Sequence, residues 1–277
     1  IDDHMVHRGD GIFEAFKCVQ GNIYLLDAHL DRLQQSAELI DLAWPMSRSE
    51  LQEAVIQTIQ AGNGHDSLIR LYISRGPGDF SPNPYASIGP QLYIVATTFN
   101  APDPSLRKKG CSLALSKIPL KPGIFSTVKS CNYLPNALMK KEAIDLGVDY
   151  TVGLDERGYL AEGPTENLGI VTRSRELLVP KFKRILRGTT LIRAMHLAQH
   201  LVHSGELQEV KETDLSPDDI VKAREVIIFG TTMDALPVVS FQEQKIDAGT
   251  PGPISNQLYE LLRRDQLENA EVLTPVF

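Results

Sequence analysis

The sequence contains little cysteine and no long apolar run. Its 277 residues include three cysteines, Cys18, Cys111 and Cys131, which are odd in number and far apart. Such a set is typical of free thiols in a reducing compartment rather than of a disulfide framework. No apolar stretch reaches the roughly 18 residues of a membrane-spanning helix, and no signal-peptide pattern is found at the start. We therefore expect a cytoplasmic protein with no membrane partner.

An excess of basic residues is also missing. Asp and Glu number 35 against 28 Lys and Arg, which gives a formal net charge of -7. Proteins dedicated to nucleic-acid binding usually carry the opposite balance, so no nucleic-acid partner is expected. Low-complexity runs are absent, and 42% hydrophobic with 23% charged residues is an ordinary globular composition, which excludes intrinsic disorder.

A proline-rich stretch is the best candidate for a linker between domains. Residues 100–104 read Asn-Ala-Pro-Asp-Pro, and such stretches commonly lie at domain boundaries. We therefore predict a small domain over residues 1–100, a linker over 101–106 and a larger domain over 107–277.

Hydrophobic periodicity predicts strands and helices in both domains. In the small domain, strands are expected at 11–19, 23–26, 67–74 and 91–97, and helices at 27–40 and 47–61. In the large domain, strands are expected at 112–115, 150–154, 159–160, 168–172 and 226–229, and helices at 136–146, 189–203 and 255–264. Asp27 and either Ser47 or Ser49 are candidate N-caps, and the Gly-Asn-Gly step at 62–64 is expected to end the second helix. The fold class is therefore α/β, of the α+β kind.

Two patterns that often mark cofactor or metal sites lack the context that they need. Gly76-Pro77-Gly78 follows a strand, but the Phe-Ser-Pro sequence at 80–82 cannot begin the helix that a dinucleotide fingerprint requires. This stretch is typical of a loop, and its Pro and Gly content suits a lid. His196, His200 and His203 share a helix face, yet no glutamate completes a metalloprotease pattern and no cysteine is near. We expect a solvated helix face and no metal site.

Two Gly-Thr-Thr steps are candidate anion-binding sites. Gly188-Thr189-Thr190 stands where a helix is expected to begin, and Gly230-Thr231-Thr232 stands where the strand at 226–229 ends. A helix N-terminus offers backbone N–H groups and a positive dipole end, and a turn after a strand can gather N–H groups in the same way. Each step alone also suits plain capping. Together they would suit one phosphate monoester.

Lys129 lies in a stretch without acidic residues. No carboxylate occurs in the eleven residues before it or in the twelve after it. A lysine in apolar surroundings is a usable nucleophile because burial disfavours the charged amine. The alternative is a lysine whose amine reaches the surface from the end of a strand. Glu162 follows among Gly, Pro and small residues, where its carboxylate could contact a ring nitrogen or could belong to an ordinary turn.

A phosphate site, a nucleophilic lysine and a carboxylate together describe a site for pyridoxal phosphate. The chain resembles the class IV aminotransferases, or fold type IV pyridoxal phosphate enzymes, which include branched-chain aminotransferases, D-amino acid aminotransferases and aminodeoxychorismate lyases. The resemblance extends from residue 7 to residue 237. It is most specific in the blocks His-Leu-Asp-Arg-Leu at 29–33, Lys-Ser-Cys-Asn-Tyr-Leu at 129–134 and Glu-Gly-Pro-Thr-Glu-Asn-Leu at 162–168.

This resemblance implies a particular architecture and particular roles. The architecture is a small N-terminal α/β domain and a larger C-terminal α/β pseudo-barrel domain, in a homodimer whose active site lies at the interface. Lys129 matches the lysine that forms the Schiff base with the cofactor and moves a proton. Glu162 matches the carboxylate that keeps the pyridine nitrogen protonated, and Arg32 matches the arginine that binds the phosphate. The other implied cofactor contacts are Thr189 and Thr190 at the helix start, Thr231 and Thr232 after the strand, Tyr133 near the 3′-oxygen and Asn167 near the ring.

The substrate residues follow from the strands that line the pocket in this family, where Phe13 and Arg70 fall. Arg70 shares a strand face with Tyr72, so its guanidinium could bind a substrate carboxylate; a solvated or ion-paired strand arginine is the alternative. The best-known D-amino acid enzymes have an Arg-x-His carboxylate site after this strand, but this chain reads Gly-Pro-Gly-Asp-Phe-Ser at 76–81. That stretch and the block at 129–136 look most like plant-type members, which are associated with both D-amino acid transamination and aminodeoxychorismate cleavage.

The resemblance therefore implies an aminotransferase that uses pyridoxal 5′-phosphate to move an amino group between an amino acid and a 2-oxo acid. The amino acid would be a D-amino acid or a branched-chain L-amino acid. The alternative is a 4-amino-4-deoxychorismate lyase that releases pyruvate and 4-aminobenzoate by the same chemistry at Lys129 and Glu162. A carrier or regulator that binds the cofactor without turnover is disfavoured, since it needs no electron sink. Contacts in the substrate pocket distinguish the two enzymes.

Overall fold

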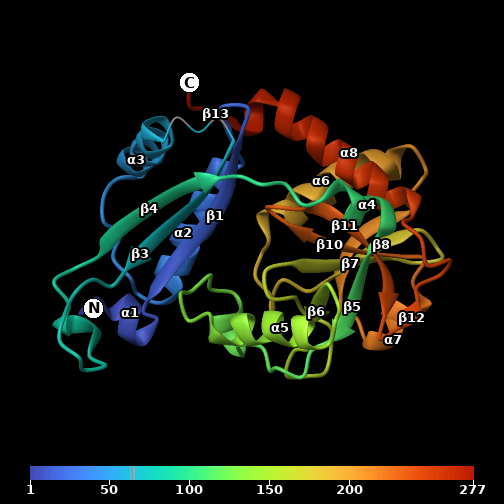
Figure 1. Ribbon diagram of the computed structural model, residues 1–277, viewed down its shortest axis with the longest axis horizontal. Helices are drawn as coiled ribbons and strands as arrows, with labels where there is room; N and C mark the ends of the chain where they lie inside the picture. The colour runs from blue at the N-terminus through green and yellow to red at the C-terminus, as the bar shows by residue number, and fades with distance from the viewer. Residues whose placement is uncertain (63, 65) are drawn as a thin grey trace. The chain divides into compact units, whose positions relative to one another are not determined.

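The chain forms two compact units in a computed structural model that describes residues 1–62, 64 and 66–277 (Figure 1). Unit 1 consists of Ile1–Asn100, Val128–Tyr133 and Asp265–Phe277, and unit 2 consists of Ala101–Thr127 and Leu134–Arg264. The first change of unit falls at Asn100, where the proline-rich linker begins. Two short segments of the range expected for the large domain belong instead to unit 1, because each of them pairs with a strand of the unit 1 sheet.

Unit 1 is built on a five-stranded sheet with the strand order β13-β2-β1-β3-β4. Every neighbouring pair is antiparallel. The edge strand β13 comes from the end of the chain, which explains why the last segment belongs to this unit. The elements are α1 (His4–Arg8), β1 (Gly11–Val19), β2 (Asn22–Tyr24), α2 (Leu26–Leu39), α3 (Arg48–Ala61), β3 (Ser67–Ser74), η1 (Pro84–Ala86), β4 (Gln91–Thr98), η3 (Ala270–Val272) and β13 (Leu273–Pro275).

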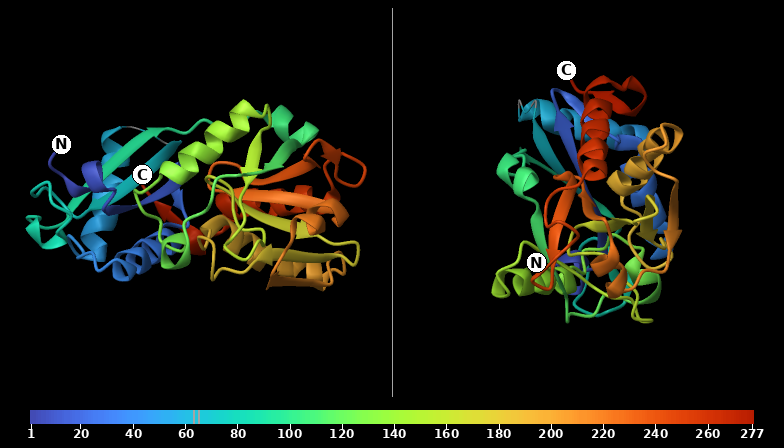
Figure 2. Two further views of the ribbon diagram at one scale, coloured as in Figure 1. Left: turned by 90° about the horizontal axis from the view of Figure 1, so that it is seen from below. Right: turned by 90° about the vertical axis from the view of Figure 1, so that its right-hand side faces the viewer.

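The two long helices of unit 1, α2 and α3, cover one face of this sheet (Figure 2, left). The alternation expected for β3 is confirmed: Ile69, Leu71 and Ile73 are fully buried against the helices, whereas Arg70 and Tyr72 are half-buried on the other face. Side chains alternate between the faces of a strand, so this one pattern sets the register of the whole strand. The second face is therefore the part of the sheet that can hold polar and aromatic groups.

Of the two long helices of unit 1, α3 begins where the local sequence predicts a cap, whereas α2 does not. Ser47 caps α3 through a capping box with Glu50, as the sequence predicts. Asp27 does not cap α2, so that prediction is wrong: the N-cap is Leu25, which has a left-handed backbone with φ of 57° and no side-chain cap. Asp27 accepts hydrogen bonds from Arg48 on α3 instead. The stop predicted for α3 includes position 63, which lies outside the described residues.

Unit 2 contains a larger mixed sheet with the order β6-β5-β11-β10-β7-β8-β9, and β12 pairs with β11. The β5–β6, β5–β11 and β8–β9 pairs are parallel, and the other pairs are antiparallel. Its strands are β5 (Cys111–Leu115), β6 (Tyr150–Val152), β7 (Asn167–Val171), β8 (Glu176–Pro180), β9 (Glu209–Thr213), β10 (Glu225–Gly230), β11 (Asp234–Phe241) and β12 (Gln244–Lys245). Its helices are α4 (Pro104–Lys109), η2 (Gly123–Ser126), α5 (Leu134–Asp145), α6 (Thr189–His203), α7 (Pro217–Lys222) and α8 (Pro253–Glu268), which ends in unit 1.

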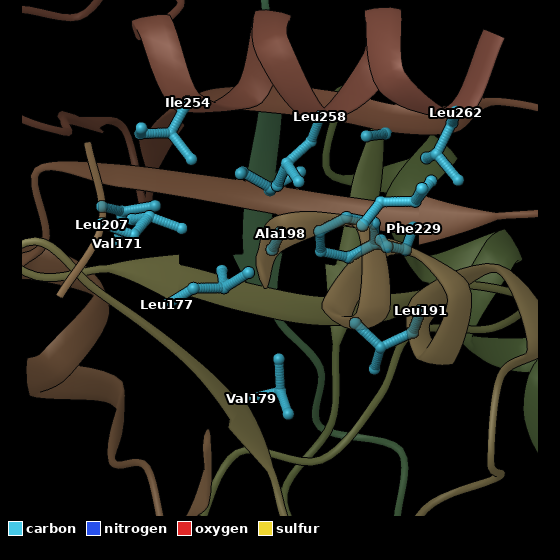
Figure 3. Close-up of a cluster of buried hydrophobic side chains, with 14 of the residues drawn as sticks. Val171, Leu177, Val179, Leu191, Ala198, Leu207, Phe229, Ile254, Leu258 and Leu262 are labelled. Carbon is cyan, nitrogen blue, oxygen red and sulfur yellow. The ribbon is translucent and has the colours of Figure 1, made fainter. Parts of the chain in front are cut away.

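The main core of unit 2 lies where α6 and α8 pack against the sheet (Figure 3). Ile254, Leu258 and Leu262 point from successive turns of α8 toward the strands, and Phe229 of β10 and Leu191 of α6 lie in the same cluster. Burial of each such side chain contributes roughly 1.5–3 kcal/mol. This packing holds the start of α6 and the end of β10 in place.

Several strands of unit 2 carry no clear local signal. Strands β8, β9 and β11 were not predicted from the sequence. Strand β9 reads Glu-Val-Lys-Glu-Thr and is largely exposed, and β11 has Pro237 in its interior, which locally argues against a strand. Their pairing with distant strands supplies what the local sequence lacks. Of the helices in the described part of the chain, none combines the length and the apolar content that a membrane crossing requires.

Candidate functional site

Lys129 lies in the short segment Val128–Tyr133 that unit 1 takes from the middle of the chain. The N–H of Phe13 on β1 donates to the carbonyl oxygen of Lys129 at 2.9 Å. The N–H of Lys129 donates to the Oγ atom of Ser36 on α2 at 3.3 Å. A strand and a helix thus hold the backbone of Lys129 from two sides, so the base of its side chain has a fixed position in unit 1.

An aromatic cluster on the half-buried face of the sheet contacts the Lys129 amine through the ring of Phe13. Its Nζ atom lies 4.6 Å from the centroid of the Phe13 ring. Tyr133 meets the Phe13 ring edge to face at 5.3 Å, and Tyr72 stacks on it at 5.7 Å. Three of the predicted residues, Lys129, Phe13 and Tyr133, are thus brought together, and Tyr72 is an addition that the sequence analysis did not assign to the site.

Arg70 lies on the same face of β3 as Tyr72. The residues directly opposite it are Ala15 on β1 and Val95 on β4, and neither carries a charge. Phe13 is the residue opposite Tyr72. The half-buried guanidinium therefore belongs to the same sheet face as the aromatic cluster of Phe13, Tyr72 and Tyr133.

Arg32 is held by a buried carboxylate that the sequence analysis missed. Its Nε atom donates to Oε1 of Glu14 and its Nη2 atom donates to Oε2, both at 2.7 Å. Nδ1 of His29 lies 2.6 Å from the same Oε2 atom. Glu14 is 0% exposed, His29 is 2% exposed and Arg32 is 8% exposed. The three side chains form one buried cluster between β1 and α2, which we call the Glu14 cluster.

The charges of the Glu14 cluster follow from its geometry. Burial alone would raise the pKa of Glu14, but the Arg32 guanidinium and the His29 ring lower it to about 2. Burial lowers the pKa of His29, and the positive charges of Arg32 and Lys129 act in the same direction against the effect of Glu14. At neutral pH the cluster therefore holds an ionised Glu14, a neutral His29 that donates its Nδ1–H, and a charged Arg32.

Glu162, the carboxylate that the sequence predicts for the site, lies in unit 2. It pairs with Asn167 in an isolated β-bridge. The Oε2 atom of Glu162 accepts a hydrogen bond from the N–H of Leu186 at 3.0 Å and from Nδ2 of Asn167 at 3.3 Å. A backbone donor and a side-chain donor thus orient this half-buried carboxylate.

Asn167 connects Glu162 to the first Gly-Thr-Thr step. Besides its bond to Glu162, its Nδ2 atom donates to the carbonyl oxygen of Leu186 at 3.1 Å. A Cβ atom added at Gly188 would lie 1.8 Å from Oδ1 of Asn167, so only glycine fits there. The structure places Asn167 between the carboxylate and the helix start, and its expected place near the cofactor ring stays a prediction.

The two Gly-Thr-Thr steps occupy the positions that the sequence predicts. Helix α6 begins at Thr189 with Gly188 as its N-cap, and no side chain caps it. Thr189 and Thr190 are buried in its first turn, where backbone N–H groups have no acceptor within the helix. Thr231 and Thr232 lie in the turn between β10 and β11 and are half-buried. Both steps therefore stay candidates for anion binding.

Arg107 on α4 supports the second step and was not predicted. It donates to the carbonyl oxygens of Ala235 at 2.7 Å and of Met233 at 3.3 Å. Its guanidinium lies over the ring of Tyr259 at 3.2 Å from the centroid. Asp234, the first residue of β11 after this turn, has a positive φ of 61°. The turn after β10 is therefore held by a long-range contact in addition to its own hydrogen bonds.

The three histidines of α6 do not form a site. His196, His200 and His203 are all exposed, and Nδ1 of His203 is bonded to the carbonyl oxygen of Gln199 at 2.6 Å. Over residues 1–62, 64 and 66–277, no group of three or more His, Cys, Asp or Glu side chains could hold a metal ion.

Comparisons with known proteins agree on one family. A family model described as amino-transferase class IV matches residues 11–241. The chain is 37% identical over 266 residues to a D-amino-acid transaminase, chloroplastic, of Arabidopsis thaliana, covering 96% of this chain and 70% of the relative. It is 31% identical over 261 residues to a putative branched-chain-amino-acid aminotransferase of Methanocaldococcus jannaschii, covering 93% and 88%. The solved branched-chain amino acid aminotransferase of Escherichia coli superposes with a TM-score of 0.92 at 26% identity, covering 100% of this chain and 93% of that one. Another solved branched-chain amino acid aminotransferase, which contains pyridoxamine 5′-phosphate, also gives a TM-score of 0.92 at 26% identity, covering 99% and 92% of the two chains.

Proposed function

The chain belongs to the class IV aminotransferases, which depend on pyridoxal phosphate, and we propose that Lys129 is the residue through which it transfers amino groups. The observation that carries this proposal is the position of Lys129. Its backbone is held by β1 and α2, and its amine lies against an aromatic ring on a half-buried sheet face. A lysine placed in this way presents its amine reproducibly to a small molecule.

The residues present fit pyridoxal phosphate. The candidate residues include an amine, a carboxylate that two hydrogen-bond donors orient, and an arginine. They also include one helix start and one turn after a strand, each of which can hold an anion. The 1.8 Å approach to Asn167 leaves no room for a Cβ atom at Gly188, so Asn167 packs directly against the start of α6. When bound, the cofactor supplies an electron sink for the carbanion at the substrate α-carbon.

Each residue then has a defined task. The Nζ atom of Lys129 would hold the cofactor and would move a proton to or from the substrate α-carbon. Glu162 would hold a proton at the pyridine nitrogen. The remaining cofactor contacts are proposed for Arg32, Thr189, Thr190, Thr231 and Thr232 at the phosphate, Tyr133 at the 3′-oxygen, and Asn167, which orients Glu162.

For the substrate we propose the half-buried face of the unit 1 sheet. Arg70 would bind the substrate carboxylate, since neither directly opposite residue offers it an acid. Phe13 and Tyr72 would contact the side chain. The relatives named above are a D-amino-acid transaminase and branched-chain aminotransferases, so both substrate classes are candidates here.

A spectral half-reaction tests the proposed function. The protein is saturated with pyridoxal phosphate, and D-alanine, L-glutamate, L-leucine or L-alanine is added without any oxo acid. We expect the absorbance of the lysine-bound cofactor to give way to that of pyridoxamine phosphate with at least one amino acid, which identifies the chirality and the side-chain class. A stable lysine-bound band with all four would contradict transamination and favour the lyase, for which pyruvate release from aminodeoxychorismate is then measured.

The assembly and the compartment are part of the same proposal. Apolar side chains are exposed on β4 and on the loop before it, including Tyr93, Val95, Tyr85 and Ile88. Such a patch supports burial against a second copy of the chain, and light scattering of the purified protein should give the mass of a dimer. Cys18, Cys111 and Cys131, all within the described residues, form no disulfide bond, which supports a reducing compartment such as the cytoplasm.

A further inference from the structure

Within the Glu14 cluster, Glu14 and His29 hold the arginine that the proposed function assigns to the cofactor phosphate. We propose that Glu14, assisted by His29, is a positioning residue that fixes the Arg32 guanidinium for phosphate binding. This inference rests on the proposed function, because it needs a phosphate-bearing cofactor at Arg32. Neither Glu14 nor His29 touches the reacting atoms in this proposal; both act through Arg32.

The two-bond contact with Glu14 restrains the guanidinium of Arg32. A planar guanidinium that makes two parallel bonds to one carboxylate cannot rotate or tilt without breaking one of them. Both bonds from Arg32 to Glu14 measure 2.7 Å. Glu14 takes two of the five N–H donors of the guanidinium, so it sets the plane of the group without using the whole donor set.

The carboxylate of Glu14 is itself held in place. Glu14 lies on a strand whose ends are paired, with Ile12 and Phe16 on either side on the same buried face. His29 donates to the oxygen that also accepts from Arg32 Nη2, which holds the carboxylate from a third direction. Strand β1 and His29 of helix α2 thus fix the position of the Glu14 carboxylate, and the carboxylate in turn fixes the position of Arg32.

Burying the charges of Glu14 and Arg32 costs free energy. Removing two charges from water costs several kcal/mol per ion, and well-packed apolar residues usually hold two elements together at least as well as a buried ion pair. Strand β1 and helix α2 already share an apolar core. A buried Glu–Arg–His cluster at this one place is therefore better explained by the orientation that it gives to Arg32 than by cohesion alone.

The test compares two probes that differ only in the phosphate, pyridoxal 5′-phosphate and pyridoxal. Each is titrated into the full-length protein at one ionic strength, and the absorbance of the lysine-bound form gives its dissociation constant. The preference for the phosphorylated probe is the ratio of the two constants. A loss of general stability weakens both probes alike, whereas a misplaced Arg32 lowers the ratio.

Four variants make the comparison specific. At metal sites, mutation of a group that orients a ligand-binding residue typically lowers affinity by roughly 10–100-fold. By analogy, we expect Glu14→Gln to lower the ratio by about tenfold. We expect His29→Gln, which keeps both charges, to lower it severalfold. Arg32→Gln shows the ratio without the arginine. Asp10→Asn is the matched control, because Asp10 makes a similar two-bond contact to Arg75 in unit 1, and it should leave the ratio unchanged.

The outcomes separate this inference from the proposed function. An unchanged ratio in folded Glu14→Gln overturns the positioning role, and so does a higher ratio, which would mean that the acid only repels the phosphate. An equal fall in Asp10→Asn also overturns it. If Glu14→Gln does not fold, the ratio for His29→Gln decides in the same way. If the wild type forms no lysine-bound absorbance that Lys129→Ala abolishes, the proposed function fails, and this inference fails with it.

Discussion

The two units hold their candidate site residues by different means. In unit 1, side chains hold side chains: Glu14 binds Arg32, and Phe13 lies under the amine of Lys129. In unit 2, the backbone supplies most of the contacts, through the N–H of Leu186 at Glu162 and the helix start at Gly188. Backbone donors depend on where elements begin and end, whereas side-chain clusters depend on which distant elements meet. A site built from backbone donors, as in unit 2, is therefore more tolerant of single substitutions than a site built from a side-chain cluster, as in unit 1.

The largest expected effect tests the centre of the unit 1 arrangement. Lys129→Ala should lower turnover by at least about a thousandfold, since removal of the group that acts covalently leaves little residual catalysis. The measurement is kcat with the amino acid that responds in the half-reaction. Lys109→Ala, which removes an exposed lysine of α4, is the control and should keep full activity. Normal turnover in Lys129→Ala would contradict the assignment.

The next effect tests the acid of unit 2. Glu162→Gln should lower kcat by roughly 10²–10³-fold, because an amide cannot hold a protonated pyridine nitrogen as a carboxylate does. The amide oxygen can still accept from the N–H of Leu186, so the cofactor should remain bound and the thermal midpoint should change little. If Glu162→Gln lowered the affinity for the cofactor by as large a factor as it lowers kcat, the role of Glu162 would be structural.

A pH experiment tests the buried charge of unit 1. The pKa of Glu14 is lowered from 4.5 to about 2 in the folded state, so its contribution is present above about pH 4.5 and is lost as the pH falls toward 2. By linkage this amounts to about 3 kcal/mol of unfolding free energy. Denaturant unfolding should therefore show that the wild type loses more stability than Glu14→Gln between pH 5 and pH 3. Glu53→Gln, at an exposed position on α3, should follow the wild type; equal pH dependence in all three proteins would sink the prediction.

The smallest effect tests the backbone site of unit 2. Gly188→Ala places a Cβ atom 1.8 Å from Oδ1 of Asn167, and the resulting shift should cost about 1–3 kcal/mol. Affinity for pyridoxal phosphate and the thermal midpoint should both fall. Gly62→Ala is a matched control, because its nearest contact would be 3.6 Å away. If Asn167 is the obstacle, adding Asn167→Ala to Gly188→Ala should recover part of the lost thermal stability.

Local sequence predicts the elements whose pattern is complete within a few residues. Strand β3, helix α6 and the capped start of α3 all lie where their periodicity and caps place them. The turn residues near Glu162 and both Gly-Thr-Thr steps were found for the same reason. Helix α2 shows the limit: its start depends on the left-handed backbone of Leu25, which no capping rule predicts.

The partners of the site residues could not be predicted in this way. Glu14 is a charged residue between two buried apolar positions of a strand, which signals a buried partner but does not identify it. Arg107 supports the turn after β10 from more than a hundred residues away, and only the packing of α4 brings it there. Nothing in its own segment distinguishes it from the exposed Lys108 and Lys109 that follow.

The sequence by itself determined the family, the lysine and carboxylate candidates, and the helices and strands with complete local patterns. These depend on residue type and short-range spacing, which a single chain displays directly. Only the tertiary structure decided that Glu14 and His29 hold Arg32, that Asn167 joins Glu162 to Gly188, and that residues 128–133 pair with β1. Those contacts join residues that are distant along the chain, and their energy arises only when the sheets and helices have packed.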